Sequence, residues 1–406
     1  MSTVAPPPHG ELEALIREAR ERQRRRQLAL AAGAAVVAAA GLSLWAAIPG
    51  RGGGQHAPND GPAGAFSREV AATGRVPIAE VGTSGGVTWA MNGLGMWLTT
   101  NGGRTWRASA PVHVREMGDV VARVEQVDFL DRRHGWLLAV DVRGGLHPAW
   151  RRHAELDWTS DGGRTWHWTM PKGCCGYVSL LDPARGYFLG RSATFATIDG
   201  GSTWKRISSL PFRGGVPTFV DARRGVAVVG KGDLFGTRDG GRRWTEIRLP
   251  DQPRKPQSQL VLPGVGLFGS RLVVPAERLG GPRSGLVVYV SADGGSTWAA
   301  RPMPSGFDPV IGSYDERRFS AAGAGVWFVA ARRELAMTRD AGRTWRRVRP
   351  LGLSPRWTIG TIDFTSASVG WAIFDGPHQS ALMRTTDGGL HWKPAGPRAA
   401  RHRRHR

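Results

Sequence analysis

TTNGGRTW, at residues 99–106, is the stretch that decides the fold, because the same eight-residue pattern returns six more times along the chain. The later copies read TSDGGRTW, TIDGGSTW, TRDGGRRW, SADGGSTW, TRDAGRTW and TTDGGLHW, and they end at residues 166, 204, 244, 298, 345 and 392. Successive copies end 38 to 60 residues apart, a period typical of repeats that each form one small antiparallel sheet. Seven such units predict a single seven-bladed β-propeller.

Each residue type in the pattern has a physical role. The paired glycines accept positive φ and so permit a tight hairpin turn, although Ala341 replaces the first glycine in one copy. The aspartate accepts hydrogen bonds from N–H groups of its own turn, and the opening Ser or Thr ties the turn from the other side. The closing tryptophan packs its ring beneath the hairpin. The turn and ring residues are Asn101, Trp106, Asp161, Trp166, Asp199, Trp204, Asp239, Trp244, Asp293, Trp298, Asp340, Trp345, Asp387 and Trp392.

A second pattern precedes most copies: an apolar run, a polar turn that ends in glycine, and another apolar run. VDFLDRRHGWLLAV (127–140) and IDFTSASVGWAIF (362–374) are examples. Runs of this length and composition are typical of strands. Each unit therefore reads as four strands, and the sequence predicts an all-β propeller over residues 66–395.

These motifs resemble the Asp-box family, also called bacterial neuraminidase repeats, and the combined unit is most similar to the photosystem II stability/assembly factor type. The resemblance implies a propeller fold and a chaperone-like role in the assembly of membrane complexes. Propellers of this kind serve unrelated functions, so the resemblance predicts the fold more specifically than the activity.

The same resemblance leaves an enzymatic alternative, a sialidase-like exo-glycosidase. Arg75-Val76-Pro77 resembles the arginine-hydrophobic-proline motif of sialidase domains, whose arginines bind the substrate carboxylate. Tyr314 beside Glu316 would then be the nucleophile pair. The aspartates of the repeated turns are not expected to be catalytic, because each belongs to a different blade. The favoured interpretation is a non-catalytic binding or assembly scaffold.

The N-terminal sequence predicts a membrane anchor. Residues 28–48 contain no charged side chain over 21 positions, close to the length of a membrane-spanning helix. Arginines crowd the preceding segment 1–27, so this segment is expected in the cytoplasm and the propeller on the outer face of the plasma membrane. A cleaved signal peptide is the alternative. Residues 49–65 form a Gly/Pro linker, and 396–406 a basic tail predicted to be disordered.

Charge suggests the chemistry of the partner. The chain of 406 residues has a formal net charge of +22, and arginines fill its predicted turns. A basic protein suggests nucleic acid, but an extracytoplasmic position argues against it, so we expect an anionic protein segment or cell-envelope polymer instead. A basic surface without a ligand is the alternative. The candidate binding residues are Arg132, Arg133, Arg185, Arg223, Arg224, Arg242 and Arg243.

The two cysteines and the histidines predict no cofactor or metal centre. Cys174 and Cys175 are adjacent in a loop, where they could form a vicinal disulfide or remain thiols. The eleven histidines show no metal-ligand spacing.

Overall fold

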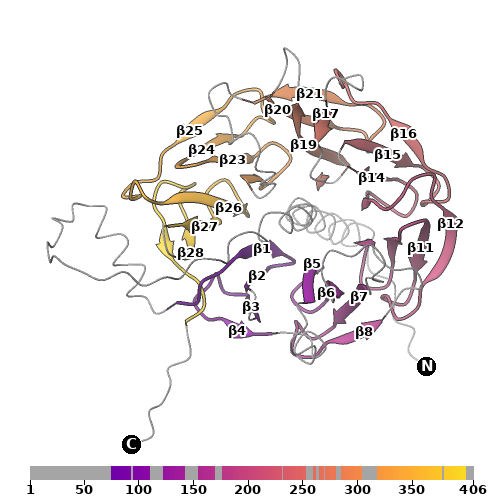
Figure 1. Ribbon diagram of the computed structural model, residues 1–406, viewed down its shortest axis with the longest axis horizontal. Coiled ribbons are helices and arrows are strands. Elements are labelled where there is room, and N and C mark those ends of the chain that lie inside the picture. Colours follow the sequence, from indigo (N-terminus) through magenta and orange to yellow (C-terminus); the bar gives the residue numbers. More distant parts are fainter. Residues whose placement is uncertain are drawn as a thin grey trace, which may run out of the picture.

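The computed structural model describes a ring of seven antiparallel sheets (Figure 1). The described residues are 75–92, 95–109, 122–141, 154–169, 176–230, 232–252, 259–261, 265–268, 270–279, 285–303, 318–376 and 379–398. The predicted segments 1–27, 28–48 and 49–65 lie outside them, as does most of the basic tail. No helix among the described residues is long and apolar enough to cross a membrane.

Each sheet is one blade of the propeller, and the blades follow one another in chain order. Blades 1 and 2 comprise β1 (Glu80–Ser84), β2 (Val87–Asn92), β3 (Gly95–Thr99), β4 (Arg107–Ala108), β5 (Ala122–Phe129), β6 (Gly135–Asp141), β7 (Ala154–Thr159) and β8 (His167–Thr169). Blades 3 and 4 comprise β9 (Tyr177–Leu180), β10 (Gly186–Leu189), β11 (Ala193–Thr197), β12 (Lys205–Ser209), β13 (Val216–Phe219), β14 (Gly225–Val229), β15 (Asp233–Thr237) and β16 (Thr245–Ile247).

The remaining three blades repeat the same order, with one variation. Blade 5 comprises β17 (Gln259–Val261), β18 (Gly266–Phe268), β19 (Arg271–Leu279), β20 (Gly285–Ser291) and β21 (Ala299–Pro302). Its first strand is divided, because β17 and β18 both pair with β19. Blades 6 and 7 comprise β22 (Phe319–Ala321), β23 (Trp327–Ala331), β24 (Glu334–Thr338), β25 (Arg346–Val348), β26 (Thr358–Phe364), β27 (Gly370–Asp375), β28 (Ser380–Thr385) and β29 (Lys393–Pro394). The prediction of an all-β, seven-bladed propeller is confirmed.

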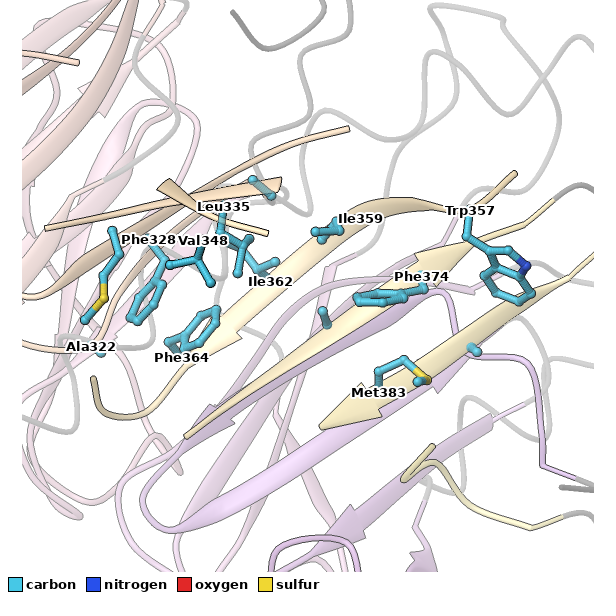
Figure 2. Close-up of a cluster of buried hydrophobic side chains, with 14 residues drawn as sticks. Ala322, Phe328, Leu335, Val348, Trp357, Ile359, Ile362, Phe364, Phe374 and Met383 are labelled. Carbon is cyan, nitrogen blue, oxygen red and sulfur yellow. The ribbon is translucent and has the colours of Figure 1, made fainter. Parts of the chain in front are cut away.

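The hydrophobic core is divided among the contacts between blades. Seven clusters of buried side chains are present among the described residues, and each joins two neighbouring blades. Figure 2 shows the cluster between blades 6 and 7, in which the rings of Phe328 and Phe364 stack with centroids 3.5 Å apart. Each blade therefore buries its apolar surface against its two neighbours, as a propeller blade must when it is a single twisted sheet.

The tryptophans of the repeated turns contribute to these clusters. Each ring packs into the cluster that its own blade shares with the preceding blade; Trp166 contacts Phe129 of that shared cluster edge-on, at 6.3 Å. Trp244, Trp298 and Trp392 also donate their indole N–H to the second glycine carbonyl of their own turn. The rings thus lie beneath their hairpins as predicted, and they also join adjacent blades.

The ring closes where the two ends of the described chain meet. The N–H of Val76 donates to the carbonyl of Pro397 (2.8 Å), and Arg75 pairs with Arg398 in an antiparallel bridge. Ile78 is fully buried between blades 1 and 7. The indole N–H of Trp106 donates to the carbonyl of Ala395 (2.7 Å). Residues 289 or more positions apart therefore hold the first blade against the last.

Candidate functional site

The repeated turns share a hydrogen-bond network that each aspartate completes within its own turn. In blade 2 the Thr159 hydroxyl donates to Asp161 Oδ1 (2.8 Å) and accepts from the N–H of Gly163 (2.8 Å). The N–H of Arg164 (2.9 Å) and both N–H and hydroxyl of Thr165 also donate to Asp161. Asn101 occupies the same place in blade 1 and accepts from Thr105 N–H (3.1 Å). The aspartate or asparagine and the opening threonine therefore hold this turn together by hydrogen bonds within it.

These hydrogen bonds explain the acidity of the turn aspartates. In Asp387, burial raises the pKa, but hydrogen bonds from the His391 N–H and ring lower it to about 2. The pKa is lowered from its ordinary value in all six aspartates of this kind, Asp161, Asp199, Asp239, Asp293, Asp340 and Asp387. Because their oxygens are engaged within separate turns, these carboxylates stabilise hairpins and are unsuited to proton transfer at neutral pH.

Two classes of turn lie on the same side of the disc, which we call the turn face. The first class, the inner turns, connects the first and second strands of each blade, and the second class is the repeated turn. The N–H of Gly240 donates to the Arg223 carbonyl (2.8 Å), which joins the two classes within blade 4. Equivalent bonds join them in blades 2, 3, 5, 6 and 7. The expected placement of both classes on one face is thereby observed.

The candidate arginines are all exposed, and they lie in these turns with different partners. Arg185 and Arg224 each form an ion pair within their own inner turn, Arg185 with Asp182 (2.7 Å) and Arg224 with Asp221 (2.8 Å). Among the remaining candidates, Arg133 Nε donates to the Ser160 carbonyl (3.3 Å) and Arg242 Nη1 to the Asp239 carbonyl (2.9 Å). Among the described residues, Arg132, Arg223 and Arg243 form no ion pair.

The positive charge is uneven around the turn face. Blade 4 carries five arginines in its two turns, at positions 223, 224, 238, 242 and 243, against two aspartates at 221 and 239. Blade 3 has one arginine, Arg185, against Asp182 and Asp199 in the corresponding turns. The positive surplus therefore gathers in blade 4, whereas blades 1, 2 and 6 each have one more arginine than aspartate in the same turns.

Two cavities open beside these turns. One, of about 770 Å³, lies between blades 4 and 5 and is lined by Arg224, Arg238 and Arg243. The other, of about 740 Å³, lies where blades 7, 1 and 2 meet, and we call it the blade 1 notch. Its lining includes Gly85, Gly86, Thr100, Arg132, Trp371 and Arg384.

The blade 1 notch exists because the inner turn of blade 1 is short. Only Gly85 and Gly86 separate β1 from β2, whereas five residues occupy the same place in blades 2, 3, 4, 6 and 7. Both glycines have positive φ, 54° and 74°, as a two-residue hairpin turn requires. The first-glycine N–H of blade 1, that of Gly102, has no inner-turn carbonyl as partner among the described residues.

Arg384 is the notch residue that the sequence analysis missed. It immediately precedes the opening Thr385 of the repeated turn, and the corresponding residues of the other blades are uncharged: Leu98, Trp158, Ala196, Gly236, Val290 and Met337. An alignment of the seven copies extended by one position would have revealed this single charged residue. Its proximity to blade 1 depends on ring closure, which no local pattern indicates.

The residues of the enzymatic alternative are only partly described. Arg75 lies at the ring closure, where its guanidinium donates to the Gly396 carbonyl. Burial there, followed by repulsion from Arg398, lowers its pKa. Tyr314 and Glu316 lie outside the described residues, as do Cys174 and Cys175. Among the described residues, no cluster of three or more His, Cys, Asp or Glu side chains is placed to hold a metal ion.

Taken together, the seven sheets and their turns define the chain as a seven-bladed β-propeller. No family model matches the sequence, and neither does any curated protein. Solved structures do match. The chain is similar to the GH74 enzyme of Niastella koreensis (12% identity, TM-score 0.55) and the GH74 xyloglucanase of Xanthomonas campestris (14%, 0.50). Each match covers 80% of this chain but 55% of the other, so the chain spans about half the length of these enzymes.

Structures of YCF48 are also among the matches. One is YCF48 bound to a D1 peptide, at 17% identity over 74% of this chain and 89% of that one, with a TM-score of 0.48. The other is YCF48 from Cyanidioschyzon merolae, at 15% identity over 74% and 91%, with a TM-score of 0.48. At 12% and 14% identity, the two GH74 structures show the propeller fold alone, and the activity of this chain is argued from its own residues.

Proposed function

We propose that the protein is a non-catalytic binding or assembly scaffold whose turn face binds an anionic partner, a protein segment or a cell-envelope component. The observation that carries this proposal is the presence of five arginines in the two turns of blade 4. A hydrogen bond to the Arg223 carbonyl holds these two turns together on one face. Guanidinium groups suit carboxylates and phosphates because they donate two parallel hydrogen bonds. The binding of a D1 peptide by YCF48 offers a parallel on the same fold.

The proposal includes the location of the propeller. The uncharged segment 28–48, with arginines before it, would anchor the chain in the plasma membrane and hold the propeller on the outer face. In that compartment, nucleic acid is not the expected partner of a basic surface. Cysteine labelling of intact cells tests this: a cysteine placed at the exposed position Ser202 should react with an impermeant reagent. Labelling only after lysis would contradict the location.

Charge reversal on blade 4 tests the binding surface. Fluorescence anisotropy of labelled decaglutamate with the full-length chain should show binding that weakens about tenfold or more in the variant Arg223→Glu/Arg224→Glu. Arg332→Glu/Arg333→Glu is the matched control, because this exposed pair lies between β23 and β24, at the opposite end of a blade. Equal effects of both reversals, or none, would contradict a specific turn-face site.

The hydrolase alternative has a direct test. The scaffold proposal predicts no turnover of a fluorogenic sialoside by the purified full-length chain. Turnover that Tyr314→Phe abolishes would replace the scaffold by a sialidase-type enzyme, since that substitution removes the candidate nucleophile and retains the ring.

A further inference from the structure

Arg384 occupies an unusual position in the blade 1 notch. Its guanidinium carbon lies 5.7 Å from the ring centroid of Trp371, a side chain that is 2% exposed, so the aromatic ring supports the charged group. Its Nη2 lies 3.3 Å from where a Cβ on Gly102 would stand, so the guanidinium covers the repeated turn of blade 1. Its Nε is buried and has no hydrogen-bond partner among the described residues. Arg384 also lines the notch, so an acceptor that enters the cavity can approach the guanidinium there.

The chain itself shows which acceptor suits this arrangement. In blade 4, Arg224 covers the first glycine of the next blade in the same way, with Nη1 3.0 Å from where a Cβ on Gly294 would stand. There the Nε donates to Asp221 Oδ2 at 2.8 Å. Blade 5 also shares with blade 1 a two-residue inner turn. The two covered glycines, Gly102 and Gly294, are equivalent in the repeat, although Arg224 reaches its glycine from an inner turn and Arg384 from the end of β28. In blade 4 a carboxylate accepts from the arginine Nε, whereas the Nε of Arg384 has no such partner among the described residues.

No carboxylate of the described residues serves Arg384. The position in blade 7 that corresponds to Asp221 is Ser366, whose hydroxyl accepts the N–H of Val369 (2.9 Å). The notch has one acidic lining residue, Asp131, and its Oδ1 accepts the N–H groups of Arg133 (2.7 Å) and His134 (2.8 Å). Its carboxylate also contacts the His134 ring at 2.9 Å. Asp131 is thus engaged within its own turn.

We propose that the blade 1 notch binds a side-chain carboxylate, from an aspartate or glutamate of an acidic protein segment, on the guanidinium of Arg384. The proposal rests on the proposed function for the origin of that segment, and it narrows the anionic partner to a protein. Arg132, exposed on the notch wall, adds a second positive charge. Thr88 and Thr100 line the same cavity.

Anisotropy of labelled hexaglutamate, amidated at its C-terminus, tests the notch in the full-length chain. Arg384→Met should weaken binding by about tenfold or more, because it removes hydrogen bonds to a charged acceptor. Arg384→Lys, which keeps the charge without the fork, should lose an intermediate amount. Arg343→Met, an exposed arginine in the repeated turn of blade 6, is the matched control and should change affinity by less than about twofold.

The outcomes separate this proposal from the proposed function. If Arg223→Glu/Arg224→Glu abolishes binding and Arg384→Met leaves it unchanged, the notch proposal is wrong and the scaffold stands. If neither variant has an effect, both fail. Binding only of the peptide with a free C-terminus would overturn the side-chain assignment. Stronger competition by inorganic phosphate than by glutarate would show that the notch prefers phosphate, which also overturns it.

A second variant tests the notch without removing Arg384. Thr100 is exposed on the notch wall, so Thr100→Glu places a carboxylate inside the cavity. We expect it to raise the melting temperature and to weaken hexaglutamate binding relative to Thr100→Gln. Both differences should vanish when Arg384→Met is added. Identical behaviour of Thr100→Glu and Thr100→Gln in the presence of Arg384 would contradict the proposal.

Discussion

At the scale of single residues, the same turn is built with an ionisable group in six blades and with a neutral one in blade 1. Asn101 reproduces the aspartate geometry: its Oδ1 accepts the N–H of Thr105, and its Nδ2 donates to the Thr105 hydroxyl (2.8 Å). In blade 2 the hydroxyl of Thr165 donates to Asp161 instead (2.7 Å). Asn101 thus keeps the bonds to Thr105 without a charge, although Asp161 also accepts the N–H of Arg164 (2.9 Å). The aspartates differ from asparagine above all in their response to pH.

The free energy of unfolding should therefore fall in acid. The folded-state pKa of the turn aspartates is lowered, so their contribution is complete above the unfolded pKa, near 4, and is lost as the pH falls toward the folded value. Between about pH 4 and 2, Asp161→Asn should make the free energy of unfolding less dependent on pH. The number of protons taken up on unfolding, which sets that slope, should fall by up to about one. Urea titrations at several pH values measure this slope.

The reverse substitution is the control for that experiment. Asn101→Asp should make the acid dependence steeper, because it adds a seventh carboxylate with the same donors around it. An unchanged slope in both variants would show that the turn carboxylates are not responsible for the acid response.

At this scale the sequence predicted the hydrogen bonds of the repeated turn and missed the partners of the arginines. The aspartate, threonine and glycine roles are local, so the eight-residue pattern was sufficient to derive them. The partners of the arginines were not: Arg185 and Arg224 are neutralised by Asp182 and Asp221, while Arg384 faces a different blade altogether. Long, flexible side chains can reach several partners, and the contact of Arg384 with blade 1 exists only in the folded ring.

At the scale of strands and turns, the inner turn ends in a glycine for a steric reason. A Cβ on Gly135, the first residue of β6, would lie 2.5 Å from the ring of Phe129, which is fully buried at the end of β5. In blade 7, Gly370 stands in the same relation to Phe364, at 2.4 Å. The aromatic ring at the end of the first strand therefore occupies the space of the missing side chain, and the two residues form one packing unit.

Gly135→Ala should destabilise the protein by about 1–3 kcal/mol, because the methyl group overpacks the cluster between blades 1 and 2. Chemical denaturation measures the effect. Phe129→Leu in the same chain should recover part of the loss, since the smaller side chain leaves room for the methyl group. If the double variant is less stable than the two single effects summed, the steric explanation is wrong.

The sequence was effective at the element scale in most blades and weakest where an element deviates from the repeat. The apolar runs and the glycine that follows them predicted the inner turns of blades 2, 3, 4 and 7. That pattern is absent from blade 5, whose first strand is divided, and from blade 1, whose inner turn is two glycines. The sequence of these segments therefore did not predict a cavity. The blade 1 notch follows from a short turn and from its neighbours in space together.

At the scale of the whole molecule, ring closure depends on a few contacts between sequence-distant segments. The predicted domain start at residue 66 was a compositional boundary, whereas the first described closing contact is at Arg75. Local periodicity shows how many blades exist, but pairing of residues 75–76 with 397–398 is a property of the completed circle. The closure was for this reason beyond sequence reasoning.

Two tryptophans at equivalent positions of the repeat distinguish the stability that comes from the closing hydrogen bond from the stability that comes from packing of the ring. The indole N–H of Trp106 donates across the closure to Ala395, whereas that of Trp345 is buried without a hydrogen-bond partner among the described residues. Trp106→Phe should cost about 1 kcal/mol more than Trp345→Phe, because only the former breaks a hydrogen bond and leaves a carbonyl unpaired. Paired urea titrations measure the difference. Equal losses would mean that the hydrogen bond does not contribute to closure.

The shared clusters between blades also have a consequence for biosynthesis. Ile78 emerges from the ribosome among the first propeller residues, yet its buried neighbours Trp371, Ile373 and Leu382 are made roughly 300 residues later. At about 5–20 residues per second, this apolar surface waits roughly 15–60 seconds for its partner. Until then the nascent propeller is an open arc with exposed apolar surface at both ends. Either end could pack against the end of a second arc. The last blade to be synthesised is therefore the step that commits each chain to a circle of its own.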